Sequence, residues 1–267
     1  MTSENFAPGY ILPNISVVDP IENEHYALIS CNDDRAMVLR RAHSQFDIFI
    51  NHFFNEFGDQ IAPTILMVLE GNPDLIGIEQ ASGFRDAIAL SYVCKARALR
   101  LVHPMSRPLQ FSSWFDFHPW IISTNFAGIV GNSPAFKYSN DAENFDGHAN
   151  AGLPHVEVRR TDCDTLLMDA LLGAWKGRFI SHPTSWRSVA LFRSLNMAYA
   201  ASQLPSGPDM THYALGRSVG LWISAFEILT HPGKDGNVGY KNIYRLLHQV
   251  PWRDQELTKP TYDAYAG

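Results

Sequence analysis

Carboxylate and imidazole side chains gather between residues 141 and 157, and these residue types bind divalent metals or transfer protons. Asp146, His148 and His155 would be the ligands of a metal-assisted hydrolase if the fold brought them together. Their spacing matches no established metal motif, and the Asn, Asp and Gly residues of this stretch favour turns for backbone reasons. We therefore expect a solvated loop that holds no metal, and we keep the hydrolase as an alternative. The whole cluster consists of Asp141, Glu143, Asp146, His148, His155 and Glu157.

Glu227 is a second candidate, because it lies in the apolar segment LWISAFEIL, where a buried carboxylate must find a partner. Arg217 lies ten residues earlier, and Arg193 lies on the preceding predicted helix. We expect Glu227 to be partly buried and to pair with one of these arginines across two helices. Such a pair more often fixes the register of helices than it takes part in chemistry, so we interpret it as structural.

The histidines and cysteines elsewhere in the chain indicate packing and a reducing compartment. His118, in the segment FHPW, is expected to be a packed loop histidine. Cys31, Cys94 and Cys163 are far apart and form no CxxC pair, which favours free thiols in the cytoplasm over disulfides or a zinc site. The sequence contains no GxxxxGKS/T, GxGxxG, GxSxG or HExxH motif, so it predicts no cofactor and none of the commonest enzyme classes.

The composition is that of a folded protein without a membrane span. With 46% hydrophobic and 18% charged residues the chain should fold, and its 267 residues exceed the usual size of one domain. A formal net charge of -6 excludes a surface that attracts nucleic acid as a whole, although a local basic patch is compatible with it. We see neither a signal peptide nor an apolar run of about 20 residues, the length that a membrane helix needs.

The first part of the chain mixes helical and extended patterns. Residues 10–18 predict an edge strand or an extended arm, because a Pro-Asn pair interrupts a β-rich run. A helix with an aromatic core stripe is expected at 32–58, and a second helix at 82–103. Between them, residues 61–69 are ambiguous between a buried helix and a strand. Residues 104–157 predict an irregular connection with short strands.

Four helical patterns fill the last hundred residues. The second and third are joined by a short Pro/Gly turn, so we expect them to form an antiparallel hairpin. The tail from Trp252 carries aromatic residues but no finished pattern. The expected caps are Thr161 with Asp164, then Ser185, then Asp209 or Thr211, and the last helix includes Tyr240, Ile243, Tyr244 and Leu247.

Residues 191–229 resemble the Apea-like branch of the HEPN family. In those proteins a helix with an R-x-x-N-x-A/S-Y run precedes a helix with an A-x-E-x-L run. Residues 84–87 and 115–175 also look like the N-terminal portion of such bacterial proteins. The residues that match the two runs are Arg193, Asn196 and Tyr199, followed by Ala225, Glu227 and Leu229.

This resemblance implies an RNA-directed protein of stress or phage defence. Many members are dimeric endoribonucleases that use an R-x-x-x-x-H motif on the last helix of a four-helix bundle. That spacing is absent here, since Arg97 and His103 are one residue too far apart, and Arg178 and His182 are one residue too close. We therefore expect association with RNA or a nucleotide without nuclease activity in this chain, whose bundle would lack its last helix.

The expected fold is mainly α with minor β structure. A helical and irregular region with short strands would span residues 1–160, and a HEPN-like helical bundle, apparently truncated, would span 161–267. A vacant helix position would expose an apolar groove along the helices of Trp222 and Tyr244, which favours self-association. The expected partners are thus RNA or a nucleotide, and a second copy through the C-terminal helices. A non-catalytic helical interaction module is the alternative.

Overall fold

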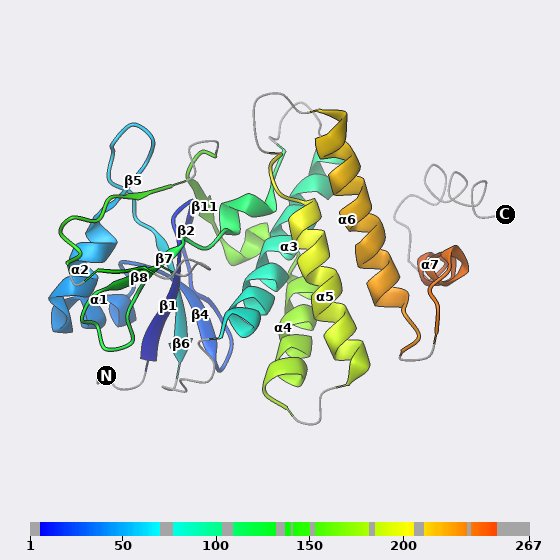
Figure 1. Ribbon diagram of the computed structural model, residues 1–267, viewed down its shortest axis with the longest axis horizontal. Helices are drawn as coiled ribbons and strands as arrows, with labels where there is room; N and C mark the ends of the chain where they lie inside the picture. The colour runs from blue at the N-terminus through cyan, green and yellow to red at the C-terminus, as the bar shows by residue number, and fades with distance from the viewer. Residues whose placement is uncertain are drawn as a thin grey trace.

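The computed structural model is a mixed α/β protein, so the expectation of a mainly α fold is wrong. Its described part holds seven α-helices and four small sheets, with 50% of residues helical and 19% in strands. Figure 1 places the sheets at one end of the molecule and the four longest helices at the other. No described helix is long and apolar enough to cross a lipid bilayer. The structure describes residues 6–69, 77–102, 109–131, 137–139, 141–149, 153–181, 185–205, 211–233 and 236–249; His103, His182, Asp209 and the tail from Trp252 lie outside them.

A four-stranded antiparallel sheet forms the centre of the N-terminal half. The predicted arm at 10–18 is two strands separated by a turn at Pro13-Asn14, and the ambiguous run at 61–69 contains a strand. Gly9 lets the first strand approach its neighbour, because a Cβ there would lie 2.9 Å from the Leu66 carbonyl oxygen. The order is β1 (Phe6–Leu12), β6 (Thr64–Leu69), β4 (Tyr26–Ser30) and β3 (Ile21–Glu22), and β2 (Ile15–Val17) follows β1 in the chain.

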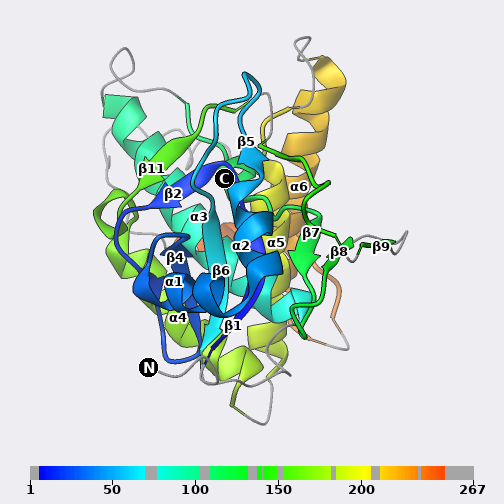
Figure 2. The ribbon, with the colours of Figure 1, turned by 90° about the vertical axis from the view of Figure 1, so that its left-hand side faces the viewer.

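Both faces of this sheet are buried, which explains the missing polar alternation in its sequence. Leu66 and Val68 face the core shared with the long helices, whereas Ile65 and Met67 face a second core. That second core is covered by α1 (Asp34–Ala42) and α2 (Ser44–Asn51). Figure 2 shows these two helices on the side of the sheet opposite the long helices.

The single helix expected at 32–58 is therefore wrong in its extent. The helix breaks at His43, whose extended backbone ends α1 and begins α2, and α2 ends at Asn51. Phe46 and Phe49 are buried as the stripe predicts, but Phe57 lies beyond the helix and is exposed. The chain after α2 forms the short strand β5 (Phe53–Phe54).

Five further helices follow, and the sequence predicted the starts of two of them. The helix expected from residue 82 begins one turn earlier, at Ile78. The Ser185 and Thr211 side chains cap their helices as expected, each accepting a hydrogen bond from a backbone N–H three residues on. Asp164 alone caps the first of the four C-terminal helices, because residues 160–162 form a separate 3-10 turn, η4 (Arg160–Asp162). These elements are α3 (Ile78–Val102), α4 (Thr165–Phe179), α5 (Trp186–Ala201), α6 (His212–Thr230) and α7 (Tyr240–Leu247).

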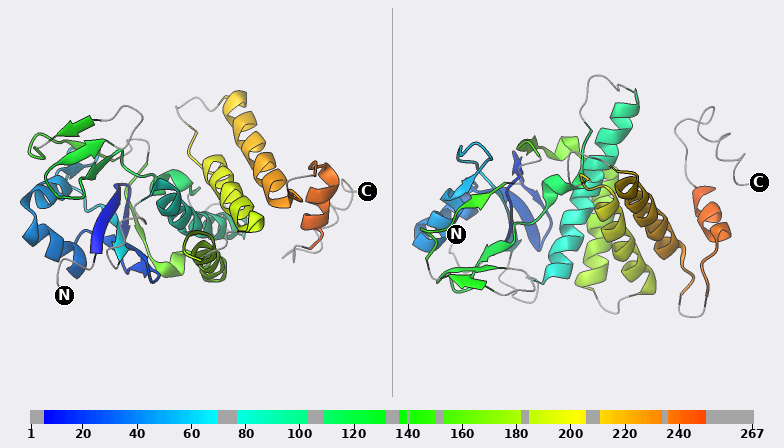
Figure 3. Two further views of the ribbon diagram at one scale, coloured as in Figure 1. Left: turned by 60° about the horizontal axis from the view of Figure 1, so that its bottom comes forward. Right: turned by 45° about the horizontal axis from the view of Figure 1, so that its top comes forward.

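The expected hairpin is confirmed, since α5 and α6 run antiparallel and pack along their length (Figure 1). Helix α3 packs against both α4 and α5, so the helical layer includes a helix from the region before residue 160. The division of the chain at residue 160 stays a prediction. Figure 3 shows α7 beside α6 at the end of the molecule farthest from the sheet.

The connection at 104–157 contains the short strands that its sequence predicts, in its described parts. Three of them form a small antiparallel sheet, and two pair in parallel with N-terminal strands, β10 with β5 and β11 with β2. This pairing fixes the connection against the N-terminal half. The elements are η3 (Ser112–Phe115), β7 (Trp120–Ile122), β8 (Ile129–Gly131), β9 (Lys137–Ser139), β10 (Gly147–His148) and β11 (Val156–Val158).

Candidate ligand-binding cavity

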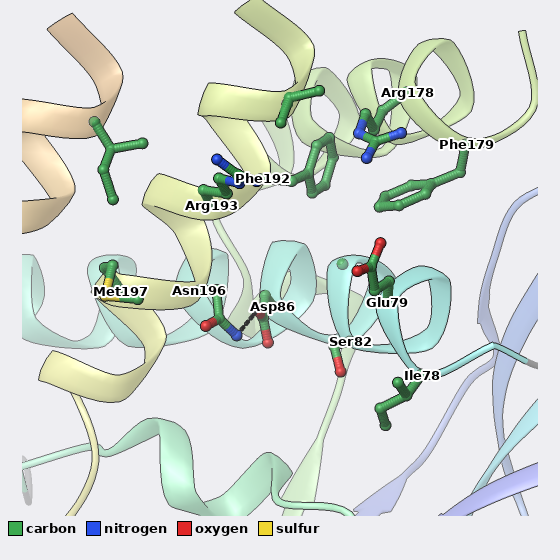
Figure 4. A pocket seen from close by; sticks show the side chains of 13 residues that line it. Ile78, Glu79, Ser82, Asp86, Arg178, Phe179, Phe192, Arg193, Asn196 and Met197 are labelled. Atoms are coloured by element: carbon green, nitrogen blue, oxygen red, sulfur yellow. Dashed lines mark hydrogen bonds between the residues drawn. The ribbon is translucent and has the colours of Figure 1, made fainter. Parts of the chain in front are cut away.

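A cavity of about 570 Å³ lies between α3, α4 and α5, and we name it the α3–α5 cavity (Figure 4). Its size falls within the range of roughly 300–1,000 Å³ that is usual for small-molecule sites. The wall combines apolar and aromatic side chains with a few charged ones, as such sites generally do. The lining residues are Ile78, Glu79, Ser82, Gly83, Asp86, Arg178, Phe179, Val189, Phe192, Arg193, Asn196, Met197 and Ile228.

One face of α3 supplies the polar floor of the cavity. Glu79, Ser82, Gly83 and Asp86 are spaced by three and four residues, so the helix presents them on one side. Gly83 brings the aromatic side chains of α4 and α5 close to α3, because a Cβ at this position would lie 2.9 Å from the ring of Phe179. The floor therefore carries carboxylate and hydroxyl groups below two aromatic rings.

Two guanidinium groups lie on the opposite wall. Arg193 is exposed on α5, and Arg178 lies near the end of α4 with its guanidinium carbon 4.9 Å from the centre of the Phe179 ring. Figure 4 shows Arg178 and Phe179 toward one end of the cavity and Asn196 with Asp86 toward the other. The arrangement offers cations to an anionic ligand and aromatic surface to a flat one.

Asp86 belongs to a buried ion pair beneath the cavity. Asp86 and Arg85 are almost fully buried, and their side chains are 2% and 10% exposed. Asp86 Oδ1 accepts hydrogen bonds from Arg85 Nε at 3.0 Å and from Arg85 Nη2 at 2.7 Å. Asp86 Oδ2 accepts one from Asn196 Nδ2 at 3.4 Å, so the ion pair is joined to a second residue that lines the cavity. Burial raises the pKa of Asp86, and the charge of Arg85 opposes this rise.

Arg85 lies between two aromatic rings and a second carboxylate is nearby. Its guanidinium carbon is 4.5 Å from the ring centre of Phe117 and 4.0 Å from that of Tyr199. Asp116 Oδ1 accepts hydrogen bonds from the Tyr199 hydroxyl at 2.7 Å and from Gln203 Nε2 at 3.2 Å. Burial raises the pKa of the Asp116 carboxyl and that of the Tyr199 hydroxyl. This network ties α3, α5 and the segment after η3 together, and it holds the cavity floor in place.

The structure separates the three residues of the predicted ion pair. Arg193 lines the α3–α5 cavity, whereas Arg217 lines another cavity next to Asp116. Glu227 is exposed, so the expected burial of its side chain is wrong. Ala225 faces the core, and two residues further along an α-helix the direction has turned by about 200°, which points Glu227 outward. Among the described residues, none of the ion pairs includes any of these three side chains.

The predicted polar loop is a set of turns. Asp141 Oδ1 accepts a hydrogen bond from the Glu143 backbone N–H at 2.8 Å, the pattern of an Asx turn. His148 lies in β10 and His155 lies just before β11, and these strands belong to different sheets. Within the described part of the chain, no group of three His, Cys, Asp or Glu residues is arranged to hold a metal ion.

His118 is a packed loop histidine, as the sequence predicted. Its Nδ1 accepts a hydrogen bond from the Trp120 backbone N–H at 3.2 Å, and its ring lies edge-on against Phe53 and Phe145. Burial lowers the pKa of His118 to about 4, so the imidazole is neutral at neutral pH. It serves the core of the sheet region.

Arg85, Asp86 and Asp116 were not predicted from the sequence as a unit, although both segments contributed to the family resemblance. The signal was present in α3, where an adjacent Arg-Asp pair interrupts an otherwise apolar run between Phe84 and Ala87. Such a pair inside a buried helix needs partners from other elements. Asp116 had no comparable signal, because its partners Tyr199 and Gln203 lie more than eighty residues away.

Compared with known proteins, the chain matches no family model, no curated protein and no solved structure. The resemblance to the Apea-like HEPN family therefore stays a prediction. The geometry of the α3–α5 cavity is the basis on which a function is proposed.

Proposed function

We propose that this protein binds RNA or a nucleotide in the α3–α5 cavity. The observation that carries the proposal is that Arg178 and Arg193 line a cavity that also contains the rings of Phe179 and Phe192. Guanidinium groups bind phosphate with charge-assisted hydrogen bonds, and aromatic side chains stack on bases. Phosphate and base are the two parts that every nucleotide has.

The attraction of a phosphate must come from the arginines at the cavity, because the whole chain has a net charge of -6. Two arginines can neutralise about two phosphates, so the affinity for a single strand should fall by roughly 1.4 decades for each tenfold rise in salt. A stronger dependence would require a larger basic surface than this cavity offers.

We propose no nuclease activity for this chain. General acid-base cleavage of RNA usually needs a histidine or a free carboxylate at the phosphate. No histidine is among the described residues that line the cavity, and Asp86 is engaged by Arg85. Glu79 is then the one other carboxylate among these described residues, without the second group that paired acid and base catalysis uses. A role in stress or phage defence follows from the HEPN resemblance alone. A cytoplasmic location is supported by the three cysteines, which are all free.

Binding to a labelled single-stranded RNA, followed by fluorescence anisotropy, tests the proposal. Arg193→Ala should weaken binding by about tenfold or more, since a hydrogen bond to a charged group contributes roughly 1.5–3 kcal/mol. Arg187→Ala is the matched control, because Arg187 is exposed on the same helix and does not line the cavity. Equal losses in both variants, or no binding by the parent, would contradict the proposal, as would cleavage of the RNA.

A second function, self-association through the C-terminal helices, is favoured by the outward face of α6. Leu215, Val219 and Ile223 lie one turn apart and are 57%, 50% and 49% exposed. The space above Gly216 and Gly220 on the same face is open. A surface helix normally presents polar residues outward, so this face fits an interface. In an antiparallel pairing of two copies, the large side chains of one α6 can lie over the glycines of the other.

Light scattering over a range of concentrations tests self-association. The parent chain should form dimers, and Val219→Glu should leave monomers. Leu166→Glu is the matched control, because Leu166 is also an exposed apolar residue but lies on α4. A parent that stays monomeric at every concentration, or equal effects of the two substitutions, would contradict this function.

A further inference from the structure

Asn196 is placed to recognise a ligand in the α3–α5 cavity. It is exposed, it lines the cavity, and it lies one helical turn after Arg193 on the same face of α5. Figure 4 shows it beside Asp86, at the end of the cavity away from Arg178. Asn196 does not belong to any of the hydrophobic core clusters of the described residues, and its amide contacts Asp86.

Asp86 decides which way the Asn196 amide points. Asn196 Nδ2 donates a hydrogen bond to Asp86 Oδ2 at 3.4 Å. A carboxylate oxygen only accepts hydrogen bonds, so it turns the amide nitrogen toward itself. Asp86 is in turn fixed by its two hydrogen bonds from Arg85. The Arg85 guanidinium packs against the rings of Phe117 and Tyr199.

This chain of contacts leaves two groups of Asn196 for a ligand. One N–H of the amide is used by Asp86, and the other N–H and the Oδ1 oxygen have no hydrogen-bond partner among the described residues. A donor beside an acceptor is the pattern that pairs with adenine, whose N7 accepts and whose N6 amino group donates. The same edge of guanine presents two acceptors, which an oriented amide cannot satisfy together.

We infer that the ligand of this cavity is an adenine nucleotide, that Asn196 recognises its base, and that Asp86 is the residue that positions Asn196. The inference rests on the proposed nucleotide-binding function and names the nucleotide. The base lies against the amide at one end of the cavity. Arg193 and Arg178 bind the phosphate, and the aromatic rings of Phe179 and Phe192 contact the flat part of the ligand.

Calorimetric titration with a pair of matched ligands tests the inference. AMP and purine riboside 5′-monophosphate differ only in the N6 amino group, and ribose 5-phosphate lacks the base entirely. The parent should bind AMP about five-fold or more tightly than purine riboside monophosphate, because a bidentate base contact is worth roughly 5- to 150-fold in affinity. GMP should bind more weakly than AMP.

Asn196→Ala should reduce the preference for AMP over purine riboside monophosphate to about one, and leave binding of ribose 5-phosphate unchanged. The exposed position of Asn196 makes this variant safe for folding, and a melting curve checks it. Asp86→Asn should lower the preference for AMP over purine riboside monophosphate and leave binding of ribose 5-phosphate unchanged. A merely structural role of Asp86 would not produce this combination. Asn242→Ala, on α7 and away from the cavity, is the control.

The outcomes separate the two proposals. Equal binding of AMP and purine riboside monophosphate by the parent, or tighter binding of GMP, would overturn the adenine inference while nucleotide binding stands. An unchanged preference in Asn196→Ala would overturn the role of Asn196. Failure of every nucleotide and of RNA to bind would overturn the proposed function itself.

Discussion

The buried network beneath the cavity can be tested by removing one oxygen atom, the hydroxyl of Tyr199. Tyr199 is buried, and its hydroxyl donates a 2.7 Å hydrogen bond to Asp116 Oδ1. Tyr199→Phe keeps the ring that lies 4.0 Å from the Arg85 guanidinium carbon, so the contact of the cation with the ring is preserved. The substitution therefore isolates the hydrogen bond.

We expect Tyr199→Phe to lower the free energy of unfolding by about 2 kcal/mol, because hydrogen bonds to charged groups contribute roughly 1.5–3 kcal/mol. Gln203 continues to donate a hydrogen bond to the same oxygen of Asp116, so the loss of free energy of unfolding should be smaller than the upper end of this range. For a chain of this size the melting temperature should fall by about 4–8 °C, since each kcal/mol corresponds to roughly 2–4 °C.

Tyr26 supplies a matched control with the opposite expectation. It is fully buried in the sheet core, and its hydroxyl has no hydrogen-bond partner among the described residues. Tyr26→Phe removes an unsatisfied polar group, so the free energy of unfolding should stay the same or rise. Urea unfolding of both variants and the parent decides the matter. A Tyr199→Phe variant as stable as the parent, or a Tyr26→Phe variant that loses as much as Tyr199→Phe, would refute the reasoning.

Three further predictions concern the core. Burial lowers the pKa of His118 to about 4, so only the unfolded chain takes up the proton near pH 6.5. The free energy of unfolding should therefore fall by about 3 kcal/mol as the pH is lowered from about 6.5 to about 4. Urea unfolding at several pH values checks this, and His118→Gln should make the dependence on pH weaker. In the native protein a thiol reagent should modify exposed Cys94 first, while buried Cys31 and Cys163 react only after unfolding. Burial also raises the pKa of Cys163 to about 12, which disfavours its reactive thiolate. Three thiols that react equally fast would contradict this. Gly147→Ala should cost roughly 1–3 kcal/mol, because the new Cβ would lie 2.7 Å from an aromatic carbon of the core, and an unchanged melting temperature would contradict that packing.

The sequence by itself determined the parts of the fold that depend on local contacts. The helix starts at Ser185 and Thr211 were predicted, because a side-chain cap bonds to a backbone N–H only three residues away. The hairpin of α5 and α6 followed from two apolar patterns and a short turn between them. The packed His118 and the short strands of the middle region were also predicted, from flanking aromatic and turn residues.

Tertiary structure alone decided the sheet and the candidate site. Residues 64–69 form a central strand because other strands pair with both of its edges and helices cover both of its faces. The two partner strands end at Leu12 and Ser30, more than about 30 residues before this strand begins. Glu227 was expected inside an apolar helix, yet Ala225 is the buried residue of α6 and Glu227 points away from it, so Glu227 is exposed. The cavity and the contacts of Arg85, Asp116 and Tyr199 join segments up to 114 residues apart. Long-range contacts of this kind leave no periodic pattern in the chain, and so only the folded protein specifies them.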